Sequence, residues 1–374
     1  MLPQGPCCHD CPHARDGAKF VPASGTGASG VLIVGDSPWK DEQIAMRPFA
    51  GAAGRILDRW FSLLSAGGMK RDDVTIFNSI QCPPLHLGWM DYPGRFPASV
   101  AAIEHCRPHL DDLIATRRPR VICPLGNVAL RRICGISGIE ENSGYVLKTP
   151  YGIPAVPGPH PSYIMRGKSK LTPLALWVLS KALRIAQGEY HESEYELVID
   201  PEPAMVASYI ASGIGSSGRI EHLFVDIETP ESATLDEEDL ESSGPSYTIL
   251  RCGISVRSGS ALTVPWHEPY ISALRPAFEA ADTIIEWADN RYDTKRLSAA
   301  GMPIPKRIVS AMWAWHWLQS DLRKGLGYVA PFFYDGPPWK HLAAADPGRY
   351  NALDVAIGLH CYEGIREQLG GTTI

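Results

Sequence analysis

Along the first half of the chain, short apolar runs alternate with segments whose apolar residues are spaced as in an amphipathic helix. Apolar residues fill 31–34, just before Gly-Asp-Ser-Pro, and similar runs occupy 74–77 and 121–123. Between the first two runs, residues 54–64 place apolar side chains three and four positions apart, which is typical of an amphipathic helix. Strands that alternate with helices predict an α/β domain built on a doubly wound parallel sheet, with loops gathered at the strand ends.

The second half follows a stretch at 189–200 that is polar at first and then starts a new strand. Further strand-like runs lie at 221–229, 249–259, 260–266 and 283–288. The later residues have mostly helical spacing, so this half predicts a second α/β domain, a sheet with flanking helices. We therefore expect two domains, over 1–190 and 195–374.

Length and composition fit a globular protein of more than one domain. The chain has 374 residues, of which 45% are hydrophobic and 20% are charged. No apolar run approaches the ~20 residues of a membrane-spanning helix. The first residues also lack the apolar core of a signal peptide. We therefore expect a cytoplasmic protein with no membrane partner.

Charge divides the chain. Residues 1–190 carry 21 basic and 15 acidic side chains, whereas the remainder carries 14 basic and 26 acidic ones. A mildly basic half could contact the phosphates of a nucleic acid. The acidic half could hold divalent metal ions, although solvated surface is the expected role of most of its carboxylates.

Four acids in the second half form a pattern. Asp226 and Glu228 lie two apart on a predicted strand, so both project from one face of it. Tyr350 and Asp354 share one face of a predicted helix, and Asp293 lies on a helix after a strand. Carboxylate oxygens suit Mg²⁺ or Mn²⁺, and two such ions can activate water against a phosphodiester. For any one of these acids alone, a surface role is the better interpretation.

The stretches FVDIET, ADNRYD and YNALD, in that order, resemble the motifs of DEDD-type 3′–5′ exonucleases. The closest likeness is to the Tyr-bearing proofreading domain of family A DNA polymerases. The resemblance implies a ribonuclease H-like fold, two Mg²⁺ or Mn²⁺ ions, and a Tyr350 that orients the attacking water. One departure is Asp289, which stands where the second motif usually has Asn, with Asn290 next. The metal ligands that the resemblance implies are Asp226, Glu228, Asp293 and Asp354.

The cysteines of the first half suggest a metal or cluster site. In a cytoplasmic chain, nine unevenly placed cysteines favour metal ligation over disulfides. Cys8 and Cys11 form one C-x-x-C pair, which zinc knuckles share. Cys82 and Cys106 follow singly, and an iron–sulfur cluster can be closed by such distant segments. The other five are expected to be small buried residues.

Three further stretches, 35–54, 78–82 and 158–170, resemble in order the motifs of iron–sulfur uracil-DNA glycosylases of the family 4 and 5 type. They read GDSPWKDEQIAMRPFAGAAG, NSIQC and GPHPSYIMRGKSK, and the likeness covers roughly residues 5–185. It implies a doubly wound uracil-glycosylase fold and a pocket for a base flipped out of DNA. It also implies a [4Fe–4S] cluster, whose ligands would be Cys8, Cys11, Cys82 and Cys106.

The resemblance also gives pocket residues their roles. Phe49 would stack on the flipped base. Asn78 would hydrogen-bond the uracil edge, since its amide offers both a donor and an acceptor. His160 would stabilise charge developing on uracil O2. The basic residues after His160 would meet the DNA backbone.

Two departures bear on catalysis. Asp36 stands where the family usually has Glu, and Glu42 matches a second acid six residues later. Either acid could act on the sugar and the attacking water. Trp39 replaces a glycine and would either exclude the thymine methyl or fill the pocket. We therefore expect uracil binding with slow or absent excision.

Together these patterns predict a DNA-processing protein that joins a uracil-recognising domain to a two-metal 3′–5′ exonuclease. One alternative is an exonuclease whose first half only binds DNA or senses modified bases. Another is a non-catalytic replisome adaptor. The arrangement resembles the N-terminal part of some phage DNA polymerases. The expected partners are single-stranded DNA or 3′ ends and a separate DNA polymerase, in a bacterial or phage-infected cytoplasm.

Overall fold

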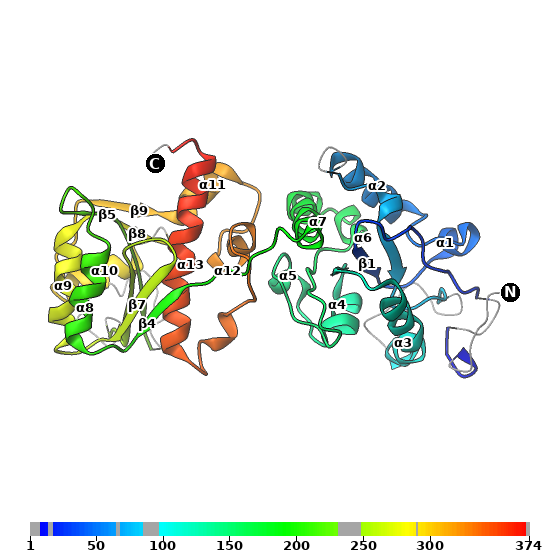
Figure 1. The fold of residues 1–374 in the computed structure, drawn as a ribbon, viewed down its shortest axis with the longest axis horizontal. Helices are drawn as coiled ribbons and strands as arrows, with labels where there is room; N and C mark the ends of the chain where they lie inside the picture. The colour runs from blue at the N-terminus through cyan, green and yellow to red at the C-terminus, as the bar shows by residue number, and fades with distance from the viewer. Residues whose placement is uncertain are drawn as a thin grey trace. The chain divides into compact units, whose positions relative to one another are not determined.

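The computed structural model describes residues 8–13, 18–64, 68–84, 97–230, 248–288 and 291–371. The chain forms two compact units. Unit 1 comprises Met1–His191 with Asp335–Pro337, and unit 2 comprises Glu192–Tyr334 with Pro338–Ile374. Figure 1 labels the helices and strands of both. Among the helices of the described residues, none has the length and apolarity needed to cross a membrane.

Unit 1 is built on a parallel sheet, as the sequence predicts. Its strands are β1 (Val31–Gly35), β2 (Thr75–Asn78) and β3 (Val121–Pro124), in the order β2-β1-β3. All three strands are buried along their length, which is the pattern of a sheet covered on both faces. Bridges at Ala155 and Gly158 continue the parallel pairing beside β3.

Helices surround this sheet in alternation with the strands. Helix α4 packs against β1 and β3, and so does α7. The helices are α1 (Lys40–Ala45), α2 (Ala52–Leu64), α3 (Pro97–Arg117), α4 (Asn127–Cys134), α5 (Ile139–Asn142), α6 (Pro161–Met165) and α7 (Thr172–Gln187). The predicted α/β class of this half is therefore confirmed.

Unit 2 contains a mixed sheet of six strands in the order β4-β7-β6-β5-β8-β9. Strands β5, β6 and β7 form an antiparallel meander, β8 and β9 run parallel to β5, and β4 runs parallel to β7. The strands are β4 (Glu196–Ile199), β5 (Ile220–Glu228), β6 (Arg251–Ser255), β7 (Ser260–Pro265), β8 (Ala281–Glu286) and β9 (Arg307–Ser310).

The two faces of this sheet are covered by different helices. In Figure 1, α8 (Pro203–Ser212), α9 (Tyr270–Ala280) and α10 (Tyr292–Ala299) lie on one side, and the long α13 (Pro347–Gln368) lies on the other. The remaining helices are α11 (Ala311–Leu318) and α12 (Leu326–Val329). Each face therefore has its own apolar core.

Strand β5 alternates between the two cores, and this alternation places its acids. Leu223 and Val225 belong to the core beneath α8 and α9, whereas Phe224 belongs to the core beneath α13. Because side chains alternate along a strand, Asp226 and Glu228 share the face of Phe224. The sequence thus directs both carboxylates toward the helix that carries Asp354.

Candidate active sites

The loops at the carboxyl edge of the unit 1 sheet bring the predicted pocket residues together. Asp36 follows β1 directly, Asn78 ends β2, and Gly126 and His160 follow the two neighbouring parallel segments. The carboxyl ends of parallel strands meet at one edge, which is where such sheets bind ligands. A Cβ at Gly126 would lie 3.1 Å from Asp36 Oδ1 and 3.2 Å from His160 Cβ, so both side chains border this glycine.

Phe49 and Asn78, two more of the predicted base-binding residues, lie at the end of β1. The Phe49 and His160 rings lie 5.4 Å apart, inclined by 30°. Any Cβ at Gly35 would collide with the Phe49 ring and the Asn78 amide. Gly35 therefore lets these two side chains approach the end of β1.

Glu42 forms hydrogen bonds with Phe49, Asn78 and the neighbouring Trp39. Its Oε1 accepts the Phe49 N–H at 2.5 Å, and its Oε2 accepts the Trp39 N–H at 2.8 Å. Its carboxylate also bonds the Asn78 side chain. Burial raises the pKa of Glu42, and these hydrogen bonds pull it back. With both oxygens engaged, Glu42 is suited to positioning the pocket more than to meeting water.

Asp36 is the acid left for chemistry. Its Oδ1 is buried and has no hydrogen-bond partner among the described residues. Burial raises the pKa of Asp36 to about 7, against the opposing effects of the Ala129 N–H and the Arg166 charge. An acid that titrates near neutrality and keeps one oxygen open can take up a proton.

His160 is held as a neutral imidazole. Burial and the charge of Arg166 together lower its pKa to about 4. The Ser162 N–H donates to His160 Nδ1 at 3.1 Å, while the Ser162 hydroxyl lies 2.8 Å from the same nitrogen. Since Nδ1 accepts, the proton of the neutral ring resides on Nε2.

The four predicted cluster cysteines are all buried, and they come from three segments of the chain. The Cys11 N–H donates to the Cys8 carbonyl at 3.2 Å, which closes a tight turn. Burial and the neighbouring Cys11 and Cys8 together raise the pKa of Cys82 to about 12. A hydrogen bond with the Cys11 thiol and burial raise the pKa of Cys106. The thiols of Cys82 and Cys106 are thus close enough to those of Cys8 and Cys11 to disfavour their own ionisation. A bound cation would reverse that effect, and cysteine sulfur is the ligand of both a [4Fe–4S] cluster and a Cys₄ zinc site.

Two histidines that the sequence analysis missed lie beside these cysteines. His109 Nε2 lies 3.5 Å from Cys8 Sγ, and His13 Nδ1 lies 3.2 Å from the Cys82 carbonyl oxygen. His109 follows Cys106 by three positions on α3, and His13 follows Cys11 by two. These short spacings are the feature of the sequence that could have indicated both histidines. The remaining described cysteines are half-buried Cys134 and buried Cys123, Cys252 and Cys361.

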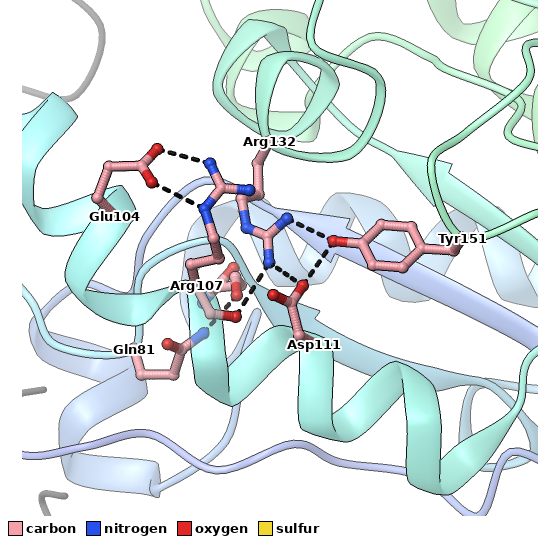
Figure 2. Close-up of polar contacts among 7 residues, drawn as sticks. Gln81, Glu104, Arg107, Asp111, Arg132 and Tyr151 are labelled. Atoms are coloured by element: carbon pink, nitrogen blue, oxygen red, sulfur yellow. Dashed lines mark hydrogen bonds and ion pairs between the residues drawn. The ribbon is translucent and has the colours of Figure 1, made fainter.

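A buried arginine braces the helix that carries Cys106. Figure 2 shows Arg132 donating to Asp111 Oδ1 at 2.5 Å, to the Tyr151 hydroxyl at 2.6 Å and to the Arg107 carbonyl at 3.0 Å. Tyr151 in turn donates to Asp111 Oδ1 at 2.6 Å. These bonds tie α3 to α4 and to the loop at Tyr151.

The same view contains Gln81, which connects the pocket with the cysteines. Gln81 lies immediately before Cys82, and its side-chain amide donates to the carbonyl oxygen of Asn78. The run from Asn78 to Cys82 therefore joins a base-pocket residue to a cluster cysteine through five consecutive positions.

In unit 2, three of the four predicted carboxylates meet. Among the described residues, Asp226, Glu228 and Asp354 each offer an oxygen within 4.8 Å of the other two. Asp293 is buried nearby but lies outside this group, and its carboxylate accepts the Ile227 N–H. Residues 289–290, where the second motif departs from the family pattern, lie outside the described residues.

The pKa values show how strongly these acids repel one another. Burial, followed by the charges of Asp354, Asp293 and Glu228, raises the pKa of Asp226 well above its usual range. Burial and Asp354 raise the pKa of Glu228 to about 7. Burial and the neighbouring Glu286 raise the pKa of Asp293 to about 8. Hard oxygen donors in mutual repulsion fit a divalent cation such as Mg²⁺ or Mn²⁺.

Asn351 is a site residue that the sequence analysis passed over. Its side-chain amide donates to Asp226 Oδ2 at 2.7 Å and to Glu228 Oε1 at 3.4 Å. Thr263 fixes the opposite end by donating to Asn351 Oδ1 at 2.6 Å. Gly253, paired with Asp226 in the sheet, leaves the space that Asn351 fills. Asn351 lies three residues before Asp354, on the same helical face, and this spacing could have indicated it from the sequence.

Asp354 is held by two more residues that the sequence did not single out. The Trp339 indole donates to Oδ1 at 2.6 Å, and Lys340 Nζ lies 2.8 Å from both carboxylate oxygens. Lys340 Nζ also donates to the Tyr350 hydroxyl at 3.2 Å. Burial and the charge of Asp354 raise the pKa of Tyr350 to about 12, so its hydroxyl stays protonated.

Comparison with known proteins concerns the first half of the chain. Residues 22–184 match the family model of the uracil DNA glycosylase superfamily. The type-4 uracil-DNA glycosylase of Pyrobaculum aerophilum is 34% identical over 131 residues, which are 35% of this chain and 61% of that protein. The Archaeoglobus fulgidus protein of the same name is 29% identical over 133 residues, 36% of this chain and 61% of the relative.

The type-4 uracil-DNA glycosylase of Thermotoga maritima is 29% identical over 187 residues, 49% of this chain and 91% of that protein. The chain thus spans about three fifths of the first two relatives. These matches identify residues 22–184 as a uracil-DNA glycosylase superfamily domain.

Proposed function

We propose that unit 1 binds a uracil flipped out of DNA between Phe49, Asn78 and His160. The observation that carries this proposal is the hydrogen bond from the Ser162 N–H to His160 Nδ1. It leaves the proton of the neutral imidazole on Nε2, from which it can be donated to uracil O2. The superfamily match over 22–184 supports the same substrate class. Flipping is required because the glycosidic bond is unreachable inside a duplex.

The pocket residues divide the work of base release among them. Phe49 stacks on the base, and the Asn78 amide reads its edge with one donor and one acceptor. As the bond between C1′ and N1 breaks, uracil leaves with a negative charge, and His160 Nε2–H stabilises that charge on O2. Ionised Asp36 stabilises the positive sugar and accepts a proton from the water that adds to C1′.

We propose further that excision is slow. Asp36 is one methylene shorter than the Glu of the family motif, and a misplacement of ~1 Å can cost on the order of a hundredfold in rate. The test uses labelled single-stranded DNA with one uracil, a thymine strand as control, and quantification of abasic sites. Uracil-selective binding with slow abasic-site formation is the expected result. Equal binding of both strands would overturn the proposal.

Trp39→Gly tests whether the Trp39 indole fills the base site or excludes thymine. If the indole fills the pocket, the substitution raises uracil affinity or the excision rate. If it excludes thymine, uracil handling persists and thymine becomes a weak substrate. A variant that treats both strands as the wild type does would show that Trp39 takes no part in base selection.

For unit 2, we propose metal-dependent trimming of DNA from the 3′ end. The approach of Asp226, Glu228 and Asp354 to within 4.8 Å carries this proposal. When bound, two Mg²⁺ or Mn²⁺ ions would activate the water and stabilise the leaving oxygen. Asp293, buried and electrostatically coupled to Asp226, would complete the ligand set. The protonated Tyr350 hydroxyl, one turn before Asp354, orients the attacking water.

The sheet of unit 2 supports this second proposal. In the order β7-β6-β5-β8-β9, an antiparallel meander is extended by two parallel strands beside its first strand. This is the order expected of a ribonuclease H-like sheet. The first motif lies on the central strand β5, and the third lies on α13, which packs across that strand.

Asp226→Ala tests the trimming activity. It should abolish Mg²⁺- or Mn²⁺-dependent shortening of 3′-ended DNA, because the remaining ligands cannot hold both ions. Tyr350→Phe should be milder, since it removes a hydroxyl and no ligand. Asp321→Ala, which removes an exposed acid of the same unit, is the matched control. Wild-type protein that trims neither DNA nor RNA ends with either ion would overturn the proposal.

The two assays also separate the alternatives. Uracil binding without base release, together with trimming, would make unit 1 a sensor for an exonuclease. Neither activity, with DNA binding retained, would make the chain a replisome adaptor. A separate DNA polymerase is the partner that either role would serve.

A further inference from the structure

Lys340 occupies a special position at the carboxylates of unit 2. Its Nζ lies 2.8 Å from both oxygens of Asp354, 3.2 Å from the Tyr350 hydroxyl and 4.8 Å from the Tyr350 ring centre. It belongs to a short 3₁₀ helix, Lys340–Leu342, that precedes α13. The ammonium group therefore faces two of the residues proposed to handle the metal and the water.

The contact with Asp354 competes with a divalent ion. Asp354 is one of the three carboxylates that lie within 4.8 Å of one another. Lys340 takes both of its oxygens, and Trp339 donates to Oδ1 as well. A metal ion needs the same lone pairs, and two cations on one carboxylate repel each other.

The other two carboxylates have a neutral partner instead. The Asn351 amide donates to Asp226 and Glu228, and it carries no charge that would oppose an ion. Within the part of the chain that the structure describes, Lys340 is thus the cationic side chain hydrogen-bonded to this group of three. Its side chain is 43% exposed, whereas that of Asp354 is 7% exposed, so the lysine is the partner with room to move.

We propose that Lys340 is a built-in competitor for the divalent ion, which holds Asp354 in the metal-free protein and must release it for metal to bind. This inference rests on the proposed metal-dependent activity of unit 2. The phosphates of a bound DNA end are acceptors that can take the displaced ammonium. Metal loading is then weak without nucleic acid and becomes stronger with it, and the coupling is reciprocal.

Mn²⁺ titration of the full chain without nucleic acid, by calorimetry or by the electron paramagnetic resonance of free Mn²⁺, tests the competition. Lys340→Gln removes the charge and keeps a long polar side chain, so it should bind Mn²⁺ at least tenfold more tightly than the wild type. Lys340→Arg keeps the charge and should stay within about threefold of the wild type. Lys306→Gln, which removes an exposed lysine of the same unit, is the matched control.

A second arm adds a single strand whose 3′-terminal linkage is a phosphorothioate that resists hydrolysis. The strand should tighten Mn²⁺ binding more in the wild type than in Lys340→Gln, because only the wild type gains from moving the ammonium. Equal Mn²⁺ affinity of wild type and Lys340→Gln in the first arm would overturn the inference.

Asp354→Asn separates a failure of the proposed metal site from a failure of the Lys340 inference. If the wild type binds Mn²⁺ and Asp354→Asn does not, the metal site stands and the Lys340 variants alone decide the inference. If neither the wild type nor Lys340→Gln binds Mn²⁺, both the metal site and the inference fail. The circular dichroism spectrum of each variant confirms that it is folded.

Discussion

Asp36 and Glu42 lie six positions apart, and their surroundings give the two carboxylates different chemistry. The two Glu42 oxygens accept hydrogen bonds from the N–H groups of Trp39 and Phe49, so Glu42 is suited to positioning these residues. Asp36 keeps a buried oxygen without a partner among the described residues, and its pKa is raised to about 7. Sequence comparison with the family motif found both acids, but only the folded environment separates their roles.

Asp36→Glu restores the length of the family's usual acid. We expect it to raise the single-turnover rate of uracil excision by roughly ten- to a hundredfold, the scale of a misplacement near 1 Å. Asp36→Asn, which keeps the shape and removes the charge, should bind uracil DNA without excising it. A rate for Asp36→Glu at or below that of the wild type would show that side-chain length is not the limiting factor.

The pH dependence of excision follows from the same residue. The active carboxylate form of Asp36 appears only as the pH rises through its folded pKa of about 7. The rate should therefore rise about tenfold per pH unit below 7 and level off above it. His160, with a pKa of about 4, stays neutral throughout this range, so its titration adds no second change to the pH–rate profile. A flat rate between pH 5 and 8 would contradict this assignment.

At the scale of elements, periodicity predicted the strands and helices that carry the motifs. The apolar runs became β1, β2, β3 and β5, and the predicted helix around Tyr350 is part of α13. Periodicity could not reveal Asn351, Trp339 or Lys340 as site residues. Their roles arise from the packing of α13 and its preceding segment across β5 and β6, and that placement is a tertiary property.

Asn351→Ala should destabilise the chain by about 1–3 kcal/mol, because Asp226 and Glu228 lose the amide that donates to them and the Thr263 hydroxyl loses its acceptor. Urea unfolding in the presence of a chelator measures the change. In a double-mutant cycle with Thr263→Val, the two effects should be non-additive, since both substitutions break the same hydrogen bond. Additive effects would show that this bond does not couple the helix to the sheet.

At the scale of the whole molecule, the two compact units have separate sheets and separate groups of candidate site residues. The alternation of strands and helices predicted the α/β class of the chain and the parallel sheet of unit 1. It could not predict the antiparallel centre of unit 2, because apolar strands have the same sequence pattern in parallel and antiparallel sheets. Pairing between β5, β6 and β7 is settled by contacts between strands.

The cysteine site allows the two chemistries to be separated by metal removal. Anaerobically purified protein should contain about four irons per chain, the content of a cubane cluster on four thiolates. Cys82→Ser should lose the iron and the binding of uracil DNA while keeping Mn²⁺-dependent end trimming. Stoichiometric zinc without iron would support a Cys₄ zinc site, and the absence of both metals would contradict the ligand assignment.

Glu42 holds Trp39 and Phe49 through their main-chain N–H groups. At position 39 such a bond survives any side chain except proline, which lacks the donor. The side chain at position 39 can therefore be exchanged while the main-chain hydrogen bond stays in place. In evolutionary terms, descendants of this sequence could sample new base preferences through single substitutions at position 39, and a directed-evolution library at that codon would explore them without rebuilding the fold.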